Sequence, residues 1–184
     1  MRVIAGIYKG FTLQSLPGKK TRPTSSKVRE AIFDILGYKI IDSEFLDIFS
    51  GTGAVGIEAI SRGAKNTTFI EINEKAIEII KTNLSKIKQT DLHIIIKDNY
   101  LNALNRISIE KKKYDIIFLD PPYNKNIAIK VLFEIEQSNI LKKESIVIIQ
   151  HTVLEDVQSG YKNLFYIKGK KYGKTRLSIF GFNE

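Results

Sequence analysis

The sequence of 184 residues contains no cysteine, only two histidines and no long apolar run. The absence of cysteine excludes disulfide bonds and thiolate metal sites, and two histidines disfavour a histidine-rich metal centre, so we predict no metal. No stretch approaches the roughly 18 apolar residues of a membrane span. Residues 1–6 lack the long apolar core of a signal peptide. We therefore expect a cytoplasmic protein, and the length fits one domain over residues 1–184.

Acidic residues are missing from both ends of the chain. The formal net charge is +9, and residues 1–29 hold seven basic residues while residues 157–183 hold six, with no acidic residue in either stretch. A nearly neutral body between two basic ends is typical of a protein that binds a polyanion. We predict contacts with nucleic acid from Lys9, Lys19, Lys20, Arg22, Arg29, Lys170, Lys171, Lys174 and Arg176.

Residues 1–23 are predicted to form a basic hairpin extension, with short strands over 2–8 and 11–16 and a basic loop after them. Pro23 ends this loop, and the hydroxyl-bearing residues 24–26 can cap a helix. The helix is expected to end at Gly37. Its apolar residues have the spacing of one buried helical face, at Val28, Ala31, Ile32, Ile35 and Leu36.

From residue 44 onward, apolar strands alternate with amphipathic helices. This alternation predicts an α/β fold with a parallel, doubly wound sheet. Stretches 162–168 and 174–182 should form a closing antiparallel pair. We predict the parallel strands over 45–49, 67–71, 92–96, 114–119 and 145–150, and helices at about 54–60, 74–87 and 126–138.

A glycine loop follows the first of these strands, with Gly51, Gly53 and Gly56 in the G-x-G-x-x-G pattern. This pattern matches the dinucleotide fingerprint, and Glu71 lies 20 residues beyond Gly51, where that fold places its ribose-binding acid. A nicotinamide enzyme is therefore one interpretation. Asp47 argues against it, because its carboxylate would repel a pyrophosphate on the same turn. S-adenosylmethionine carries an ammonium and a sulfonium instead, and Asp47 suits both.

Acidic residues stand at the ends of four successive strands, namely Asp47, Glu71, Asp98 and Asp120. The carboxyl ends of parallel strands meet at one edge of the sheet, where ligands of open α/β sheets bind. Each acid alone could cap a turn or pair with a lysine. Together they predict a site for a methyl donor, in which Glu71 accepts from the ribose hydroxyls and Asp98 from the adenine amino group.

The strand over 114–119 is followed by Asp120-Pro121-Pro122-Tyr123. Neither proline has an N–H to donate to the sheet, so the carbonyl of Pro121 can accept a hydrogen bond from a ligand. Together with the Asp120 carboxylate it suits a group with two N–H donors, such as the exocyclic amine of a base. Tyr123 offers a flat face for a base taken out of its stack. A turn that merely closes a strand is the alternative interpretation.

These motifs resemble those of class I S-adenosylmethionine-dependent methyltransferases that methylate amino nitrogens, and more closely those of the RsmD-type 16S ribosomal RNA guanine-N2 methyltransferases. The resemblance covers nearly the whole chain. It rests on residues 2–6, Thr21-Arg22-Pro23-Thr24, Val28-Arg29-Glu30, residues 47–53, Ser61-Arg62-Gly63-Ala64, Asp120-Pro121-Pro122-Tyr123 and Tyr172-Gly173.

The resemblance implies a Rossmann-like, mostly parallel seven-stranded sheet with helices on both faces. It also implies a monomer that uses S-adenosylmethionine to methylate one guanine of 16S ribosomal RNA, within the small subunit or its assembly intermediate. The catalytic residues would be Asp120, Pro121, Pro122 and Tyr123. The cofactor-binding residues would be Asp47, Phe49, Gly51, Thr52, Gly53, Glu71, Ile72, Asp98 and Asn99.

Three other interpretations stay open at this point. The Asp-Pro-Pro-Tyr motif also suits an amino methyltransferase that acts on adenine in DNA or on a protein glutamine, although no separate target-recognition domain is evident. The glycine pattern alone allows a nicotinamide oxidoreductase. A non-catalytic RNA-binding or ribosome-assembly factor could keep the same fold.

Overall fold

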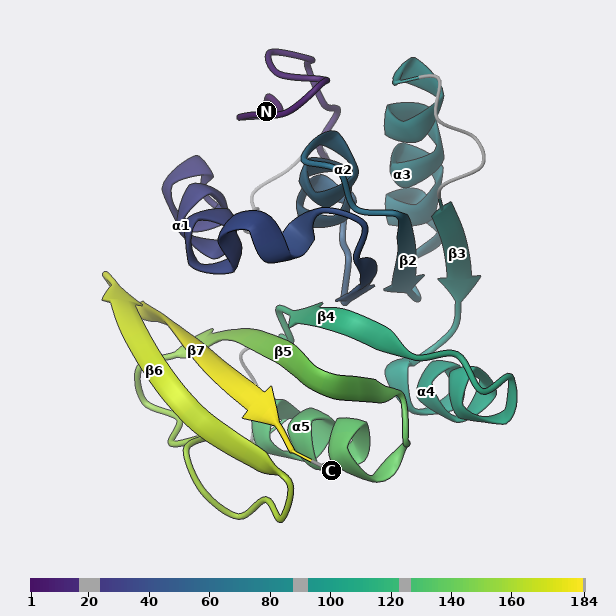
Figure 1. Ribbon diagram of the computed structural model, residues 1–184. Helices are drawn as coiled ribbons and strands as arrows, with labels where there is room; N and C mark the ends of the chain where they lie inside the picture. The colour runs from purple at the N-terminus through teal and green to yellow at the C-terminus, as the bar shows by residue number, and fades with distance from the viewer. Residues whose placement is uncertain (17–23, 88–92, 123–126, 184) are drawn as a thin grey trace.

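The computed structural model describes residues 1–16, 24–87, 93–122 and 127–183. Its centre is a seven-stranded sheet in the order β3-β2-β1-β4-β5-β7-β6 (Figure 1). The strands are β1 (Glu44–Ile48), β2 (Asn66–Glu71), β3 (His93–Lys97), β4 (Tyr114–Leu119), β5 (Leu141–Thr152), β6 (Leu164–Tyr172) and β7 (Thr175–Phe182). The strands β1 to β5 pair in parallel, and β7 pairs antiparallel with β5 and β6. The predicted parallel sheet with a closing antiparallel pair is confirmed.

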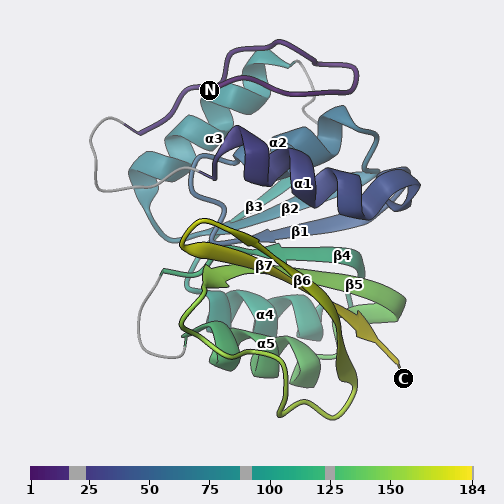
Figure 2. The ribbon, with the colours of Figure 1, turned by 90° about the vertical axis from the view of Figure 1, so that its left-hand side faces the viewer.

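Helices cover both faces of the sheet. Figure 2 shows α1, α2 and α3 on one face and α4 and α5 on the other. None of the helices in the described ranges is long and apolar enough to cross a membrane. The helices are α1 (Ser26–Leu36), α2 (Ala54–Ser61), α3 (Glu74–Lys86), α4 (Tyr100–Ile109) and α5 (Ile127–Gln137), and a short 3-10 helix, η1 (Gly37–Ile40), follows α1.

The register of the parallel strands places their carboxyl ends at one edge. Ile48 at the end of β1 is paired with Ile70 on β2 and with Leu119 on β4. These residues are almost completely buried, with exposed fractions of at most 2%. Because the chain leaves each strand immediately beyond such an anchored residue, the loops after β1, β2 and β4 begin side by side.

The N-terminal segment, residues 1–16, differs from its prediction. The strands expected over 2–8 and 11–16 are reduced to one bridge between Arg2 and Thr12. Much of the segment's backbone bonds to α2 instead, and Val3 and Leu13 are buried against α2 and α3. At Gly6, where φ is +84°, an added Cβ would lie 1.8 Å from the backbone oxygen of Ser61, so only glycine fits.

Glu58 is the centre of this attachment. Its carboxylate is fully buried and accepts the backbone N–H groups of Ile4 at 2.8 Å and Ala5 at 2.9 Å. It also pairs with Arg62, the residue directly after its own helix, at 2.9 Å and with Arg29 on α1 at 3.4 Å. One carboxylate therefore joins the N-terminal segment, α1 and α2.

The prediction that Arg29 contacts nucleic acid is wrong. Its side chain has no solvent exposure, and its guanidinium faces Glu58 and the backbone oxygen of Arg2. Burial lowers the pKa of Arg29, an effect that the nearby Glu58 carboxylate partly offsets. Arg29 therefore holds the fold together and is closed to a ligand.

Candidate active site

The glycine loop after β1 turns sharply through three residues with positive φ. Phe49, Gly51 and Gly53 have φ values of +62°, +55° and +76°, and Gly53 directly precedes α2. The Phe49 ring packs against Tyr100 with the ring centroids 5.5 Å apart. The backbone oxygen of Thr52 accepts a hydrogen bond from the buried Asn83 of α3, which also bonds to Gln14. Neighbouring elements therefore fix this loop.

Asp47 lies beneath the loop, with 1% of its surface exposed. Its Oδ2 accepts the backbone N–H of Gly56 in the first turn of α2 at 2.9 Å. Burial raises the pKa of Asp47 to about 8, the charges of Asp120 and Glu71 add to the rise, and the Gly56 N–H opposes it. A cationic ligand beside Asp47 would reverse this shift, because it would stabilise the carboxylate.

Glu71 connects the end of β2 to the loop. Its Oε2 accepts the backbone N–H of Gly51 at 2.8 Å, and its Oε1 accepts those of Ile72 and Asn73 at 2.9 and 2.8 Å. These bonds fix the position of the carboxylate next to the glycine loop. Ile72 follows it with 66% of its side chain exposed, so it offers an apolar surface to a ligand.

Asp98 and Asn99 follow β3 and begin α4, a helix that the sequence analysis does not predict. Asn99 caps α4 by accepting the backbone N–H of Asn102 at 3.0 Å. Asp98 Oδ1 accepts the backbone N–H of Asn99 at 2.7 Å and the side-chain amide of Asn102 at 2.9 Å. The structure therefore places Asp98 and Asn99 at the same edge of the sheet as Glu71. Their side chains form hydrogen bonds within residues 98–102 and none of these bonds joins them to the glycine loop.

Asp120 stands at the end of β4. Its Oδ2 accepts hydrogen bonds from the Gln150 side chain at 2.9 Å and from the Thr24 hydroxyl at 3.3 Å. Pro121 is buried and Pro122 is exposed. Tyr123 lies outside the described residues. Two elements far apart in the sequence, β5 and the segment before α1, thus orient the Asp120 carboxylate.

Sequence reasoning missed both of these partners. Gln150 could have been found from the pairing of β4 with β5, because Leu119 is in register with Ile149 and the next residues are therefore neighbours. Thr24 was considered only as a helix cap, and the cap is in fact Ser25, whose side chain accepts from Val28.

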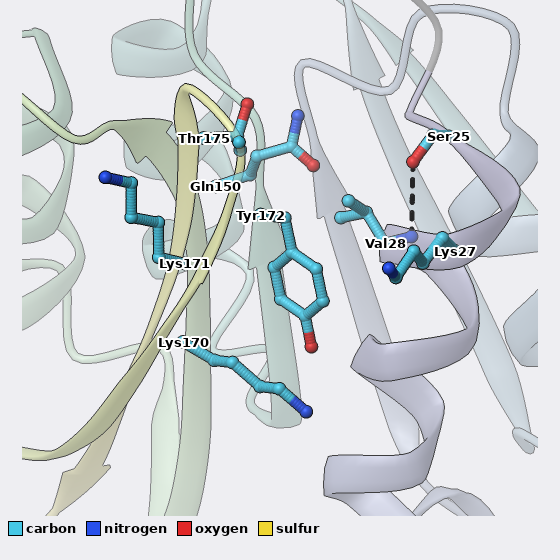
Figure 3. Close-up of a pocket in the computed structure, with 9 residues that line it drawn as sticks. Ser25, Lys27, Val28, Gln150, Lys170, Lys171, Tyr172 and Thr175 are labelled. Carbon is cyan, nitrogen blue, oxygen red and sulfur yellow. Dashed lines mark hydrogen bonds between the residues drawn. The ribbon is translucent and has the colours of Figure 1, made fainter.

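A cavity of about 490 Å³, with Gln150 in its lining, lies between α1 and the β6–β7 hairpin (Figure 3). Lys27 comes from α1, and the predicted RNA-binding residues Lys170 and Lys171 come from β6. Lys174 and Arg176 lie on the same hairpin, in its turn and in β7, and Lys9 is exposed in the N-terminal segment. Lys19, Lys20 and Arg22 lie outside the described residues.

The residues at this edge fit S-adenosylmethionine. Gly51 has open space beside it, because a Cβ added there would meet no atom within 4 Å. The donor set at the ends of β1, β2 and β3 consists of carboxylates, which suit a ligand with an ammonium, a sulfonium and ribose hydroxyls. The pyrophosphate of a dinucleotide would lie on the same turn as Asp47, whose carboxylate would repel it. In the described part of the chain, no three metal-ligating residues come together.

The strand order, the glycine loop and the acidic strand ends define a Rossmann-like methyltransferase. Comparison with known proteins identifies the family. The model of the family described as Conserved hypothetical protein 95, the RsmD family, matches residues 1–181, and the chain belongs to this family. The predicted fold and family are therefore confirmed.

Individual relatives agree with this assignment. The chain is 36% identical over 182 residues to ribosomal RNA small subunit methyltransferase D of Buchnera aphidicola subsp. Baizongia pistaciae, covering 98% of this chain and 91% of that protein. The solved structure of yhhF from Escherichia coli has a TM-score of 0.88 at 27% identity, over 100% of this chain and 98% of that chain. SMU.776, solved in complex with SAH, has a TM-score of 0.69 at 16% identity, over 88% of this chain and 50% of that chain, and shares the fold.

Proposed function

We propose that this protein uses S-adenosylmethionine to methylate the exocyclic N2 amino group of one guanine in 16S ribosomal RNA. The observation that carries the proposal is the position of Asp120. Its carboxylate is held by Thr24 and Gln150 where the acidic cofactor edge meets the lysine-lined cavity. The small-subunit ribosomal RNA named for the Buchnera relative and the SAH bound to SMU.776 support the same substrate and cofactor.

The cofactor is held by the loop and the acids. Glu71 would accept hydrogen bonds from the ribose hydroxyls, Asp98 would accept one from the adenine amino group, and Asp47 would attract the positive charge of the ligand. Phe49, Thr52, Ile72 and Asn99 complete the lining. S-adenosylmethionine supplies a methyl group on a positively charged sulfur. The protein's contribution is to position this group and to keep the surroundings negative.

Asp120 and the carbonyl of Pro121 act on the target amine. The lone pair of a guanine amino group is delocalised into the ring, so the amine is a weak nucleophile. Two acceptors that draw its N–H bonds out of the ring plane concentrate the lone pair on nitrogen as the methyl group arrives. The new N–C bond would form as the methyl–sulfur bond breaks and leaves a neutral thioether, and the nitrogen would then lose one proton, to Asp120 or to water. Tyr123 is proposed to stack on the flipped base.

The substrate is proposed to be the small ribosomal subunit or its assembly intermediate, and the enzyme to act as a cytoplasmic monomer. A comparison of rates on unmethylated small subunits and on protein-free 16S ribosomal RNA tests the first point. Faster methylation of the subunit is expected. Equal or faster methylation of the free RNA would contradict it. Light scattering measures the molar mass of the purified protein in solution and so tests whether it is a monomer.

Cofactor affinity should depend on pH through Asp47. The pKa of its carboxyl group in the free protein is about 8, above its ordinary value, so the group is protonated at neutral pH and the cationic ligand must displace the proton. The affinity for S-adenosylmethionine is therefore expected to rise with pH between 6 and 7.5, by up to about tenfold per pH unit. Calorimetric titration measures it.

Asp47→Asn is the matched control, because it cannot titrate and should bind with weak, nearly constant affinity over this range. A wild-type affinity that does not change with pH would contradict the role of Asp47. The raised pKa of Asp47 also makes the stability of the fold depend on pH. The stability that this group contributes is fully present below its ordinary pKa and is lost as the pH rises through about 8.

RNA affinity should depend steeply on salt. If roughly five to eight phosphates are neutralised, affinity falls about 10²- to 10⁴-fold between 50 and 200 mM salt. The exposed lysines Lys171 and Lys174 contribute to this slope, and replacing both with alanine should make it shallower by roughly 1.5. Filter binding of 16S ribosomal RNA over a salt series measures it. An RNA affinity that does not change with salt concentration would contradict the proposed role of the basic ends in RNA binding.

A further inference from the structure

The lysine-lined cavity, between α1 and the β6–β7 hairpin, is lined by residues other than those of the acidic cofactor edge. We propose that it is a subsite for the ribose-phosphate of the nucleotide next to the target guanine, an inference that rests on the proposed function. Its volume of about 490 Å³ lies within the range of small-ligand pockets. The occupant would be an RNA nucleotide that is still joined to the flipped base.

Charge is the first argument. Among the residues described around the cavity, Lys27, Lys170 and Lys171 are lysines and none is a carboxylate. At the cofactor edge the pattern is reversed, because the side chains of Asp47, Glu71 and Asp98 are carboxyl groups. Asp120 stands between the two regions. A cationic cofactor and a polyanionic strand are therefore attracted to different surfaces that both adjoin this residue.

Continuity with Asp120 is the second argument. Gln150 lines the cavity and also donates to Asp120 Oδ2 at 2.9 Å. Ser25, another lining residue, directly follows Thr24, which is the second donor to the same oxygen. The cavity therefore begins one side chain away from the carboxylate that binds the target amine. A neighbouring nucleotide of the same strand is the group that lies at this distance from a flipped base.

Tyr172 is the third argument. Its hydroxyl group is buried and has no hydrogen-bond partner within the described ranges, although it belongs to a residue that lines the cavity. Lys170 Nζ lies 5.6 Å from the centroid of its ring. Figure 3 shows Lys27 entering from the α1 side and Lys170 from the β6 side of Tyr172. The amines of Lys27 and Lys170 are donors for a phosphate, and the buried Tyr172 hydroxyl beside them gains a partner when its side chain turns into the cavity.

Two variants test the subsite. Lys27→Ala/Lys170→Ala removes two of the amines, and Tyr172→Phe removes only the hydroxyl group. The control is Lys65→Ala/Lys143→Ala, which removes two exposed lysines near the amino ends of β2 and β5, at the opposite edge of the sheet. Binding of 16S ribosomal RNA, methylation of unmethylated small subunits and calorimetric binding of S-adenosylhomocysteine are measured for each, with circular dichroism to check folding.

The double lysine variant is expected to weaken RNA binding about ten- to a hundredfold and to raise KM with little change in kcat. Tyr172→Phe should lower kcat/KM by about tenfold. The control should stay within about twofold of wild type in RNA binding, and all variants should bind S-adenosylhomocysteine as wild type does. RNA binding that falls equally in the control and in the cavity variant would overturn the subsite.

Two further outcomes separate the subsite from the enzyme's function. If wild type binds RNA through the cavity lysines but methylates no guanine, the proposed function fails, and the cavity is left as an RNA-binding site with no link to a target guanine. If wild type methylates guanine and Lys27→Ala/Lys170→Ala does so with unchanged KM, the subsite fails and the function stands. Saturable binding of adenosine monophosphate that this variant abolishes, with RNA binding unchanged, would assign the cavity to a free nucleotide and overturn the proposal.

Discussion

Replacement of Asp120 by alanine is expected to lower the rate of methyl transfer by roughly 10³-fold or more. The reason is that this carboxylate accepts from the reacting amine, and Gln150 and Thr24 hold it in place for that contact. Single-turnover methylation of small subunits measures the effect. Binding of S-adenosylmethionine should change by no more than a few-fold, because the bonds that fix the glycine loop come from Glu71 and Asn83.

Asp34→Ala is the matched control for this experiment. It removes an exposed carboxylate of α1 and should leave the rate unchanged. Retained activity in Asp120→Ala would contradict the role assigned to the motif. Loss of cofactor binding in the same variant would instead place Asp120 in the cofactor site.

Replacement of Glu58 by alanine is expected to lower the free energy of unfolding by about 3–5 kcal/mol. Removing this carboxylate leaves the fully buried Arg29 guanidinium without its counter-charge. It also removes the acceptor for two backbone N–H groups of the N-terminal segment. For a chain of this size such a loss corresponds to a fall in Tm of roughly 6–20 °C, which calorimetry measures.

The comparison variant is Glu78→Ala on α3. Glu78 pairs with Lys81 at 2.8 Å, but both side chains are more than half exposed, so its loss should change the free energy of unfolding by less than about 1 kcal/mol. Similar losses in the free energy of unfolding for Glu58→Ala and Glu78→Ala would show that burial of Glu58 does not determine its contribution to stability. The double variant Arg29→Met/Glu58→Leu should be more stable than Glu58→Ala, because no buried charge is left unpaired.

The elements that were predicted correctly are those whose signals are local. The helix predicted at about 74–87 is α3, which Asn73 caps, and the predicted stop at Gly37 ends α1 with a φ of +53°. The alternation of apolar strands and helices was enough to place Asp47, Glu71, Asp98 and Asp120 at one edge, because parallel strands that run in register end together.

The errors arise where a contact between distant elements decides the outcome. Arg29 lies three and four residues before Ile32 and Phe33 and so shares their buried face, but its charge suggested exposure. The N-terminal strands are reduced to one bridge because the backbone N–H groups of Ile4, Ala5 and Tyr8 bond to Glu58 and Ser61 of α2. The helix α4 buries only Ala103, Leu104 and Ile107, a pattern too short to be recognised by periodicity alone.

The most direct test of the central claim uses small ribosomal subunits that lack N2-methylguanosine, S-adenosylmethionine with a labelled methyl group, and nucleoside analysis after complete digestion. The account predicts that the label appears in N2-methylguanosine with the wild-type enzyme and disappears with Asp120→Ala. Label in a different nucleoside would contradict the proposed target while leaving the fold and cofactor in place. No label at all, from a protein that binds the cofactor, would contradict methylation of the small subunit itself.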